Sequence, residues 1–230
     1  MGFIKRERKR KFEFKHFGVS HSVDRPEPGY EPLSVHNPST GVDVIKYVQK
    51  FDAVEGQVVD AEWYDRKDDG GHRYVGYLLT MDVEGELINL DFPYGKPAYR
   101  VLTRCGKNVD WTRPVQFSAW QSSTPQGKPT IAVCFSQGET PEGKKNIIKW
   151  AYTREHPNGC PEPTESVKGL NWDNVERWLK AQFDSGVLPR IKAAGQAYAR
   201  PTSANDAAMS AQAPLTDEAY PYEEDDSVPF

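Results

Sequence analysis

The stretch Gln57-Val-Val-Asp-Ala-Glu-Trp-Tyr64 alternates in character along the chain and places Val59, Ala61 and Trp63 on one face. Alternation with a period of two is typical of a β-strand that buries one face. The next segment, Arg66 to Gly71, ends in two glycines that can adopt positive φ, so it predicts a tight turn. The stretch therefore predicts the first strand of a hairpin in a β-rich domain.

Similar signals continue along the chain beyond this turn. We expect strands at Arg73 to Met81, Glu86 to Phe92, Pro114 to Ser122, Thr130 to Ser136 and Asn146 to Thr153. Ala98 to Cys105 predicts a short helix, with Gly106 as its C-cap. Three strands, a short helix and further strands are the element order of an OB-fold barrel of five or more strands, which makes the expected class mainly β. Another small sandwich or barrel remains open, because element order does not fix topology.

The segments on either side of the barrel have a different character. Val42 to Phe51 is compatible with a short helix or a strand. Trp172 to Phe183 carries apolar residues at helical spacing, and Leu188 to Tyr198 predicts a second helix; we expect them to pack on the barrel or on another subunit. The predicted parts are a basic arm with a Pro-rich linker (1–40), an OB-fold nucleic-acid-binding barrel (41–155), a helical extension (156–200), and a disordered tether with an acidic tip (201–230).

Charge is distributed unevenly along the 230 residues, although the formal net charge is only −4. Residues 201–230 hold seven acids and no base, which leaves 29 bases and 26 acids in residues 1–200. A basic arm near the N-terminus suits contact with a polyanion or with the chain's own acidic segment, and a frayed, solvated end is the alternative. The bases of the arm are Lys5, Arg6, Arg8, Lys9, Arg10 and Lys11.

Several classes of protein are disfavoured by what the sequence lacks. No apolar run has the length of a membrane span, and no apolar core follows the basic N-terminus as in a secretory signal, so we expect a cytoplasmic protein. Cys105, Cys134 and Cys160 are odd in number and widely spaced, which fits free thiols. Neither a Gly-rich phosphate loop nor a catalytic motif is present, so we expect no enzyme and no cofactor. His156 and Cys160 lack the paired spacing of a zinc site, so we expect no metal.

Aromatic and basic residues are interleaved in several of the expected strands. Single-strand binding uses this combination, because bases stack on aromatic rings while Lys and Arg contact phosphates. Trp120 shares its strand face with Gln116 and Ser118, which favours a surface position, whereas about half of these aromatic residues are expected to fill the barrel. The candidate nucleic-acid-binding residues are Trp63, Tyr64, Arg66, Lys67, Arg73, Tyr74, Tyr77, Trp111, Arg113, Trp120, Lys144, Lys145, Lys149, Trp150, Tyr152 and Arg154.

The sequence ends with Asp225-Asp226-Ser227-Val228-Pro229-Phe230, after further acidic residues. A phenylalanine ring beside a free carboxylate can fill an apolar pocket while the carboxylate meets Arg or Lys. The segment resembles the acidic tip of bacterial single-stranded-DNA-binding proteins, and several phage single-stranded-DNA-binding proteins end similarly; it departs at Ser227, where the bacterial pattern usually has Asp. The resemblance implies an OB-fold that coats single-stranded DNA and a tip that recruits replication and repair enzymes. The tip residues would be Asp225, Asp226, Val228, Pro229 and Phe230.

These observations together predict a single-stranded-DNA-binding protein of phage type. We expect it to coat and protect single strands without sequence specificity during DNA replication, recombination and repair, to self-associate on the strand, and to recruit partner enzymes through its tip. One alternative is an OB-fold adaptor that acts by protein contact, with a tail that mimics the tip of a host protein and with weak or absent affinity for oligonucleotides. The other is a nucleic-acid-processing enzyme, which would show metal-dependent cleavage of a labelled strand.

Overall fold

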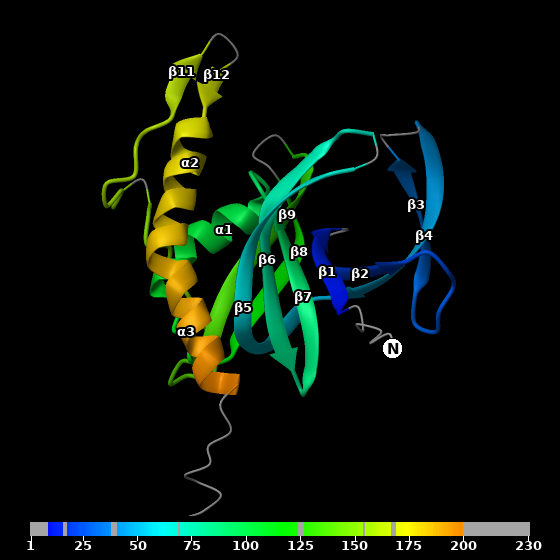
Figure 1. The fold of residues 1–230 in the computed structure, drawn as a ribbon, viewed down its shortest axis with the longest axis horizontal. Coiled ribbons are helices and arrows are strands. Elements are labelled where there is room, and N and C mark those ends of the chain that lie inside the picture. Colours follow the sequence, from blue (N-terminus) through cyan, green and yellow to red (C-terminus); the bar gives the residue numbers. More distant parts are fainter. Residues whose placement is uncertain are drawn as a thin grey trace, which may run out of the picture. The chain divides into compact units, whose positions relative to one another are not determined.

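The computed structural model describes residues 9–15, 18–37, 41–68, 70–123, 127–153, 155–166 and 169–199, which fold into a mainly β structure with helices on one side (Figure 1). The strands are β1 (Arg10–Lys15), β2 (Gly18–Val23), β3 (Glu31–Asn37), β4 (Val42–Phe51), β5 (Ala53–Lys67), β6 (Arg73–Val83), β7 (Glu86–Pro93), β8 (Val115–Ser123), β9 (Pro129–Glu139), β10 (Lys145–Ile147), β11 (Thr164–Ser166) and β12 (Gly169–Asn171). The helices are α1 (Pro97–Cys105), the 3-10 helix η1 (Gly106–Asn108), α2 (Asp173–Gln182), the π-helix η2 (Phe183–Val187) and α3 (Leu188–Ala199).

Strand β5 joins the two parts of a large sheet. The sheet has the strand order β10-β9-β8-β5-β6-β7-β1-β2-β4-β3, and β11 pairs separately with β12. β5 pairs with β6 from Gln57 to Lys67 and with β8 from Ala53 to Gly56. A β-bulge at Val58 to Asp60 interrupts the pairing with β6, and such bulges bend a strand. One long, bent strand therefore connects β6 and β7 on one side to β8 and β9 on the other.

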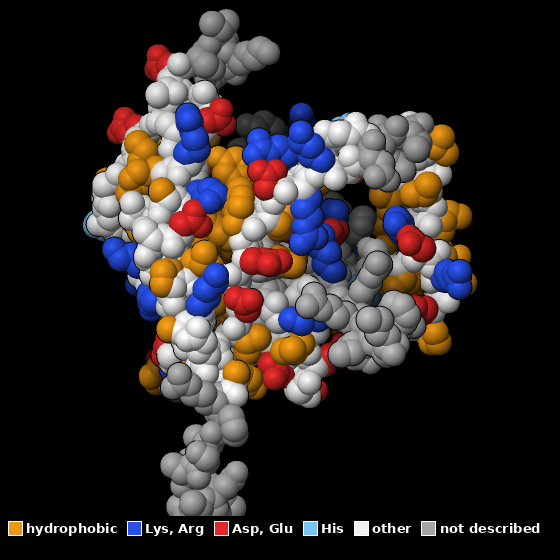
Figure 2. All heavy atoms as spheres, in the orientation of Figure 1, with side chains coloured by type: hydrophobic (Ala, Val, Ile, Leu, Met, Phe, Trp, Pro, Cys, Tyr) orange, Lys and Arg blue, Asp and Glu red, His pale blue; other side chains and the backbone are white. Residues whose placement is uncertain are grey.

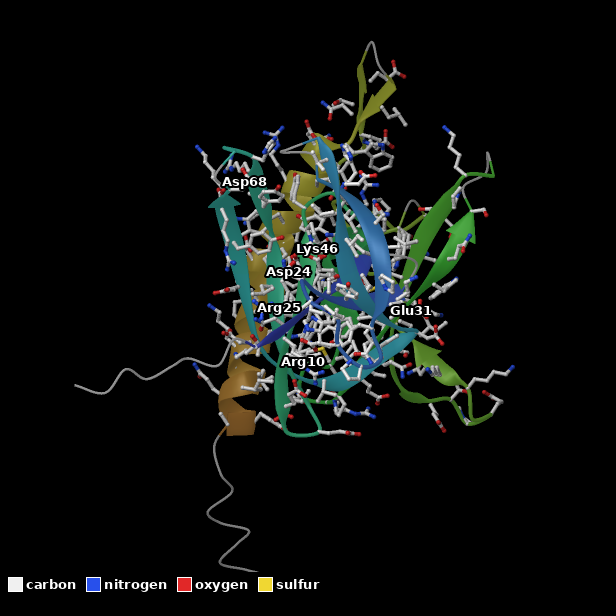
Figure 3. The ribbon with its side chains drawn as sticks, turned by 90° about the vertical axis from the view of Figure 1, so that its right-hand side faces the viewer. Arg10, Asp24, Arg25, Glu31, Lys46 and Asp68 are labelled. Atoms are coloured by element: carbon white, nitrogen blue, oxygen red, sulfur yellow. The ribbon has the colours of Figure 1, made fainter. Side chains whose placement is uncertain are left out.

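Strands β2, β4 and β3 lie on the side of the molecule opposite α2 and α3 (Figure 1). β3 is the edge strand of this group and contains Pro32, whose missing N–H is tolerated at an edge. An ion pair of 2.6 Å joins the Nζ of Lys46 in β4 to Asp24, which directly follows β2 (Figure 3). These strands attach to the rest of the sheet through β1, which lies parallel to β7 and antiparallel to β2.

The core lies on one face of β5, β6 and β7. Alternate residues of these strands are buried there, including Ala61, Leu79 and Phe92. Tyr99 of α1 and Phe183 of η2 belong to the same buried cluster. The opposite faces of the same strands carry the polar residues that form the candidate site, because side chains alternate along a strand.

Helix α3 packs onto this sheet, whereas α2 packs against α1, where Arg100 pairs with Glu176, and against Ala151 and Tyr152. Ile191 and Ala194 of α3 are buried in the main core. Gly195 lies so close to β5 that a Cβ atom there would sit 1.7 Å from the carbonyl oxygen of Val59. The chain up to Ala199 clusters as one compact unit, so the contacts do not separate the expected barrel from the expected helical extension. None of the helices in the described part of the chain is long and apolar enough to cross a membrane.

Many of the expected elements are found, most of them within one or two residues of their predicted bounds, although β5 extends three to four residues further at each end than the predicted strand. The hairpin from Gln57 onwards is found in β5 and β6, Glu86 to Phe92 in β7, Ala98 to Cys105 in α1, and the two C-terminal helices in α2 to α3. Val42 to Phe51 is a strand, which settles an alternative that the sequence left open.

Two expectations about secondary structure are wrong. The last predicted strand, Asn146 to Thr153, is found only as the short β10 (Lys145–Ile147). The backbone N–H of Ile148 makes one more hydrogen bond to β9, at Phe135, and that of Ala151 bonds to Arg104 in α1. Residues 10–37, where we expected an arm and a linker, contain β1, β2 and β3. β3 pairs with the following strand β4, whereas β1 also pairs with β7, which is distant in the sequence, so local patterns did not indicate that neighbour.

Cys105 should resist alkylation in the folded protein. Its thiol is almost fully buried, and burial raises its pKa to about 12. Only ~1 in 10,000 molecules would then carry the reactive thiolate at pH 8. Cys134 and Cys160 are partly exposed, although burial raises their pKa as well. Peptide mapping after iodoacetamide treatment at pH 8 should find Cys134 and Cys160 modified before Cys105, and equal modification of all three without denaturant would contradict the buried position.

Candidate nucleic-acid interface

A groove of about 910 Å³ lies on the polar face of β5, β6, β7 and β1. Lys and Arg side chains gather along this hollow in the surface, as Figure 2 shows. The lining residues are Lys9, Lys11, Glu13, Lys15, Glu62, Tyr64, Arg66, Lys67, Asp68, Arg73, Tyr74, Val75, Leu78, Asn89, Asp91, Pro93, Tyr94 and Lys96. Seven of these are Lys or Arg and four are Asp or Glu, so the groove carries a net positive charge that favours a polyanion.

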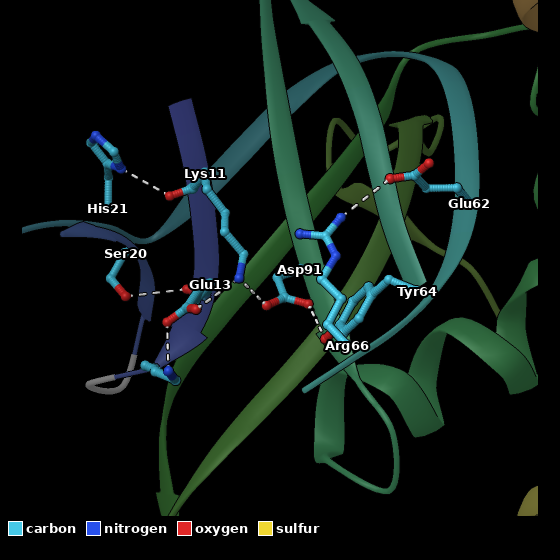
Figure 4. Close-up of polar contacts among 9 residues, drawn as sticks. Lys11, Glu13, Ser20, His21, Glu62, Tyr64, Arg66 and Asp91 are labelled. Atoms are coloured by element: carbon cyan, nitrogen blue, oxygen red, sulfur yellow. Dashed lines mark hydrogen bonds and ion pairs between the residues drawn. The ribbon is translucent and has the colours of Figure 1, made fainter. Parts of the chain in front are cut away.

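Tyr64 forms the floor of the groove together with Asp91 (Figure 4). Tyr64 in β5 pairs with Gly76 in β6, and a Cβ atom at Gly76 would lie 2.8 Å from the tyrosine hydroxyl. Glycine therefore leaves room for the end of the ring to cross β6. The hydroxyl donates a 2.7 Å hydrogen bond to Oδ1 of Asp91 in β7, whose side chain is only 4% exposed. The ring thus extends from β5 across β6, and its hydroxyl is held at β7.

The electrostatics of this floor keep Tyr64 neutral. Burial raises the pKa of its hydroxyl, and the hydrogen bond to Asp91 raises that pKa further. The second carboxylate oxygen of Asp91 accepts an ion pair of 2.6 Å from Nζ of Lys11. Burial alone would lower the pKa of Lys11, but the hydrogen bond to Asp91 and the charges of Asp91 and Glu13 outweigh it and raise that pKa. Lys11 therefore stays charged on the wall of the groove.

Several further groove cations are held by carboxylates. Glu13 lies between Lys11 and Lys15, at 3.2 Å and 2.6 Å from their Nζ atoms. Burial would raise the pKa of Glu13, but the hydrogen bond and charge of Lys15 and the charge of Lys11 lower it. Arg66 lies 3.7 Å from Glu62, and its guanidinium carbon is 5.4 Å from the centroid of the Tyr64 ring.

The end of the groove is formed by the β5–β6 turn. Arg73 at the start of β6 forms an ion pair with Asp65. Tyr74 is half exposed, and its hydroxyl donates a 3.1 Å hydrogen bond to Asp68. The ion pairs found among the described residues do not include Lys9, Lys67 or Lys96. The lining therefore contains both carboxylate-bound cations and cations for which the described residues provide no such partner.

The structure brings together part of the predicted site. Tyr64, Arg66, Lys67, Arg73 and Tyr74 all line the groove, and so do two bases that we assigned to the arm, Lys9 and Lys11. The remaining described arm residue, Arg10, forms an ion pair with Glu86 instead. Lys5, Arg6, Arg8, Arg154 and the tip residues Asp225, Asp226, Val228, Pro229 and Phe230 lie outside the described residues.

Other predicted residues lie on a different part of the surface. Trp120 in β8 and Trp150 after β10 are 46% and 44% exposed, and the guanidinium of Arg104 lies 4.8 Å from the Trp150 ring. Neither tryptophan lines the groove. The same holds for the exposed bases Arg113, Lys144, Lys145 and Lys149.

Four aromatic residues predicted to contact bases are instead buried or partly buried. Tyr77 and Trp111 are buried in the main core, and Tyr152 is buried in a smaller cluster with Val175. Trp63 is partly buried, packs edge-on against Tyr77 at 5.0 Å, and has the Nζ of Lys180 only 4.1 Å from its ring. The rings of Tyr77 and Trp111 have no free face for a base, because the core covers them.

The sequence reasoning missed several groove residues. Tyr94 and Lys96 follow β7, and this aromatic–cation pair has the same character as the stretches that we did select. Lys15 and Glu13 enter the groove because β1 lies beside β7, and no signal in the sequence indicated that pairing. Asp91 lies in β7 itself, within the predicted strand Glu86 to Phe92. The described residues contain no group of three or more His, Cys, Asp or Glu side chains placed to hold a metal ion.

Comparisons with known protein families, with curated proteins and with solved structures found no match to this chain.

Proposed function

We propose that the chain binds single-stranded DNA in the groove formed by β5, β6, β7 and β1. The observation that carries this proposal is the aromatic floor: Tyr64 is fixed across Gly76 by Asp91 within a groove that has seven Lys and Arg residues. An unpaired base has a free π-face that can stack on such a ring, while the cations contact the phosphates on either side. Tyr74 and Tyr94 offer further rings along the same groove.

The proposed scaffold is an OB-fold barrel with additional strands. The order β5, β6, β7, α1, β8, β9 has three strands, a helix and two strands, and β5 pairs with both β6 and β8. This is the element order expected for an OB-fold, which binds oligonucleotides on the face of its second and third strands. In this chain those strands would be β6 and β7, and both contribute residues to the groove.

The proposed biological role is that of a coating protein. Stacking and phosphate contacts carry no base-specific information, so binding of this kind is independent of sequence and suits protection of strands during replication, recombination and repair. Recruitment of partner enzymes through the acidic segment stays a prediction from the sequence, since that segment lies outside the described residues.

The direct test is a titration of a labelled oligo-dT strand, followed by fluorescence anisotropy at two salt concentrations. We expect binding to the single strand to be tighter than binding to a duplex of equal length, because bases within a duplex cannot stack on Tyr64. Affinity should fall with rising salt, because phosphate neutralisation releases counterions, with a slope of about −0.7 per neutralised phosphate on a log–log plot. Equal affinity for the duplex, or an affinity independent of salt, would refute the proposal.

A further inference from the structure

The cations of the groove fall into two groups. Lys11, Lys15, Arg66 and Arg73 each form an ion pair with a carboxylate. Lys9, Lys67 and Lys96 line the same groove, and no such pair to them is found in the described part of the chain. A strand that enters the groove therefore meets some cations that are available and some that are already neutralised.

Glu62 holds Arg66 where a base would have to stack. The guanidinium lies over the Tyr64 ring at 5.4 Å and reaches Glu62 at 3.7 Å (Figure 4). A base that stacks on the outward face of this ring takes the place of the guanidinium. Both members of the Arg66–Glu62 pair are largely exposed, so the pair is weak and can be broken by an incoming strand.

Glu13 in β1 binds groove cations in the same way as Glu62. It lies between Lys11 and Lys15 and contacts both Nζ atoms, and its own carboxylate is three-quarters buried. A phosphate that approaches either lysine is repelled by this carboxylate and must compete with it. Asp91 differs from Glu13 and Glu62, because it also accepts the hydrogen bond that fixes Tyr64.

We propose that Glu13 and Glu62 are counter-charges that set the strength and the salt dependence of strand binding. This inference rests on the proposed function of the groove and goes beyond it. Binding is then an exchange, in which phosphates replace carboxylates at Lys15 and Arg66 while Lys9, Lys67 and Lys96 provide the first contacts. The carboxylates released in this exchange take up cations from solution. That uptake offsets part of the counterion release from DNA, so the salt dependence is shallower than the number of phosphate contacts alone would give.

The test replaces each carboxylate by its amide and measures affinity for oligo-dT. We expect Glu62→Gln to tighten binding by about 3- to 10-fold at low salt, since it frees Arg66 and removes a nearby negative charge. Glu13→Gln should act in the same direction, and both variants should give a steeper salt dependence. The matched control is Glu165→Gln, which removes an exposed carboxylate in β11, away from the groove, and should leave the affinity within about 2-fold.

The outcomes separate this inference from the proposed function. Failure of the unsubstituted chain to bind oligo-dT would refute the function and the inference together. Binding by the unsubstituted chain, with equal or weaker binding by Glu62→Gln, would refute the inference alone. Equal tightening by Glu165→Gln would show an effect of net charge and would also refute it. Glu62 is exposed, so its substitution should leave the melting curve unchanged and the folded state intact.

Discussion

Replacing Gly195 with alanine should destabilise the protein by about 3 kcal/mol, because it forces helix α3 away from β5. A Cβ atom at this position would lie 1.7 Å from the carbonyl oxygen and 2.6 Å from the carbonyl carbon of Val59. Both are backbone atoms, so no side-chain rotation relieves the clash. The helix must shift, and Ile191 and Ala194 then lose part of their burial in the core. Denaturant unfolding followed by circular dichroism, with linear extrapolation to water, measures this cost.

Gly186→Ala is the matched control for that substitution. Gly186 lies in the π-helix η2, and a Cβ atom there would meet no heavy atom within 4 Å. Alanine is favoured over glycine in helices by up to about 1 kcal/mol, so this variant should be neutral or slightly more stable. Similar stabilities of the two variants would show that α3 does not pack against Val59 in the way the structure places it.

The strands β5, β6 and β7 could be predicted because their signals are local. The alternation in β5 and the glycines after Arg66 both act over a few residues. The position of β1 depends instead on pairing with β7, which is distant in the sequence. Basic residues such as Arg10 and Lys11 resemble a solvated arm until that partner is known. The structure places their strand within the sheet, where it adds Lys11, Glu13 and Lys15 to the groove.

Some residues of the candidate site could be predicted from the sequence. The alternation of side chains along a strand decides which of the predicted aromatic residues face the groove. The alternation that placed Ala61 and Trp63 on one face also places Tyr64 on the other. Adjacent residues of one strand cannot both present their rings to the same ligand. Ala61 is buried, so the core lies on the Trp63 side, and Tyr64 faces the groove. Selecting both aromatic residues as base contacts was therefore inconsistent with the predicted strand itself.

Replacing Tyr64 with alanine should weaken binding to oligo-dT by about 5- to 150-fold, which corresponds to the loss of about 1–3 kcal/mol from one stacked base. The ring is held at both ends, by its strand and by the hydrogen bond to the buried Asp91, whereas the Tyr74 ring is half exposed. Such a fixed ring loses little conformational entropy when a base stacks on it. Fluorescence anisotropy of a labelled strand at constant salt measures the change.

Two further variants separate the ring from its surroundings. Tyr64→Phe keeps the π-face but removes the hydroxyl that Asp91 accepts, so binding should stay within about 3-fold if stacking carries the affinity. Tyr198→Ala removes an exposed tyrosine of α3 that lies outside the groove lining, and it should leave the affinity unchanged. Loss of binding in Tyr64→Phe equal to that in Tyr64→Ala would mean that the hydrogen bond to Asp91 shapes the groove and that no base stacks on the ring. Unchanged binding in Tyr64→Ala would exclude the floor of this groove as the strand-binding surface and would direct attention to the exposed rings of Trp120 and Trp150.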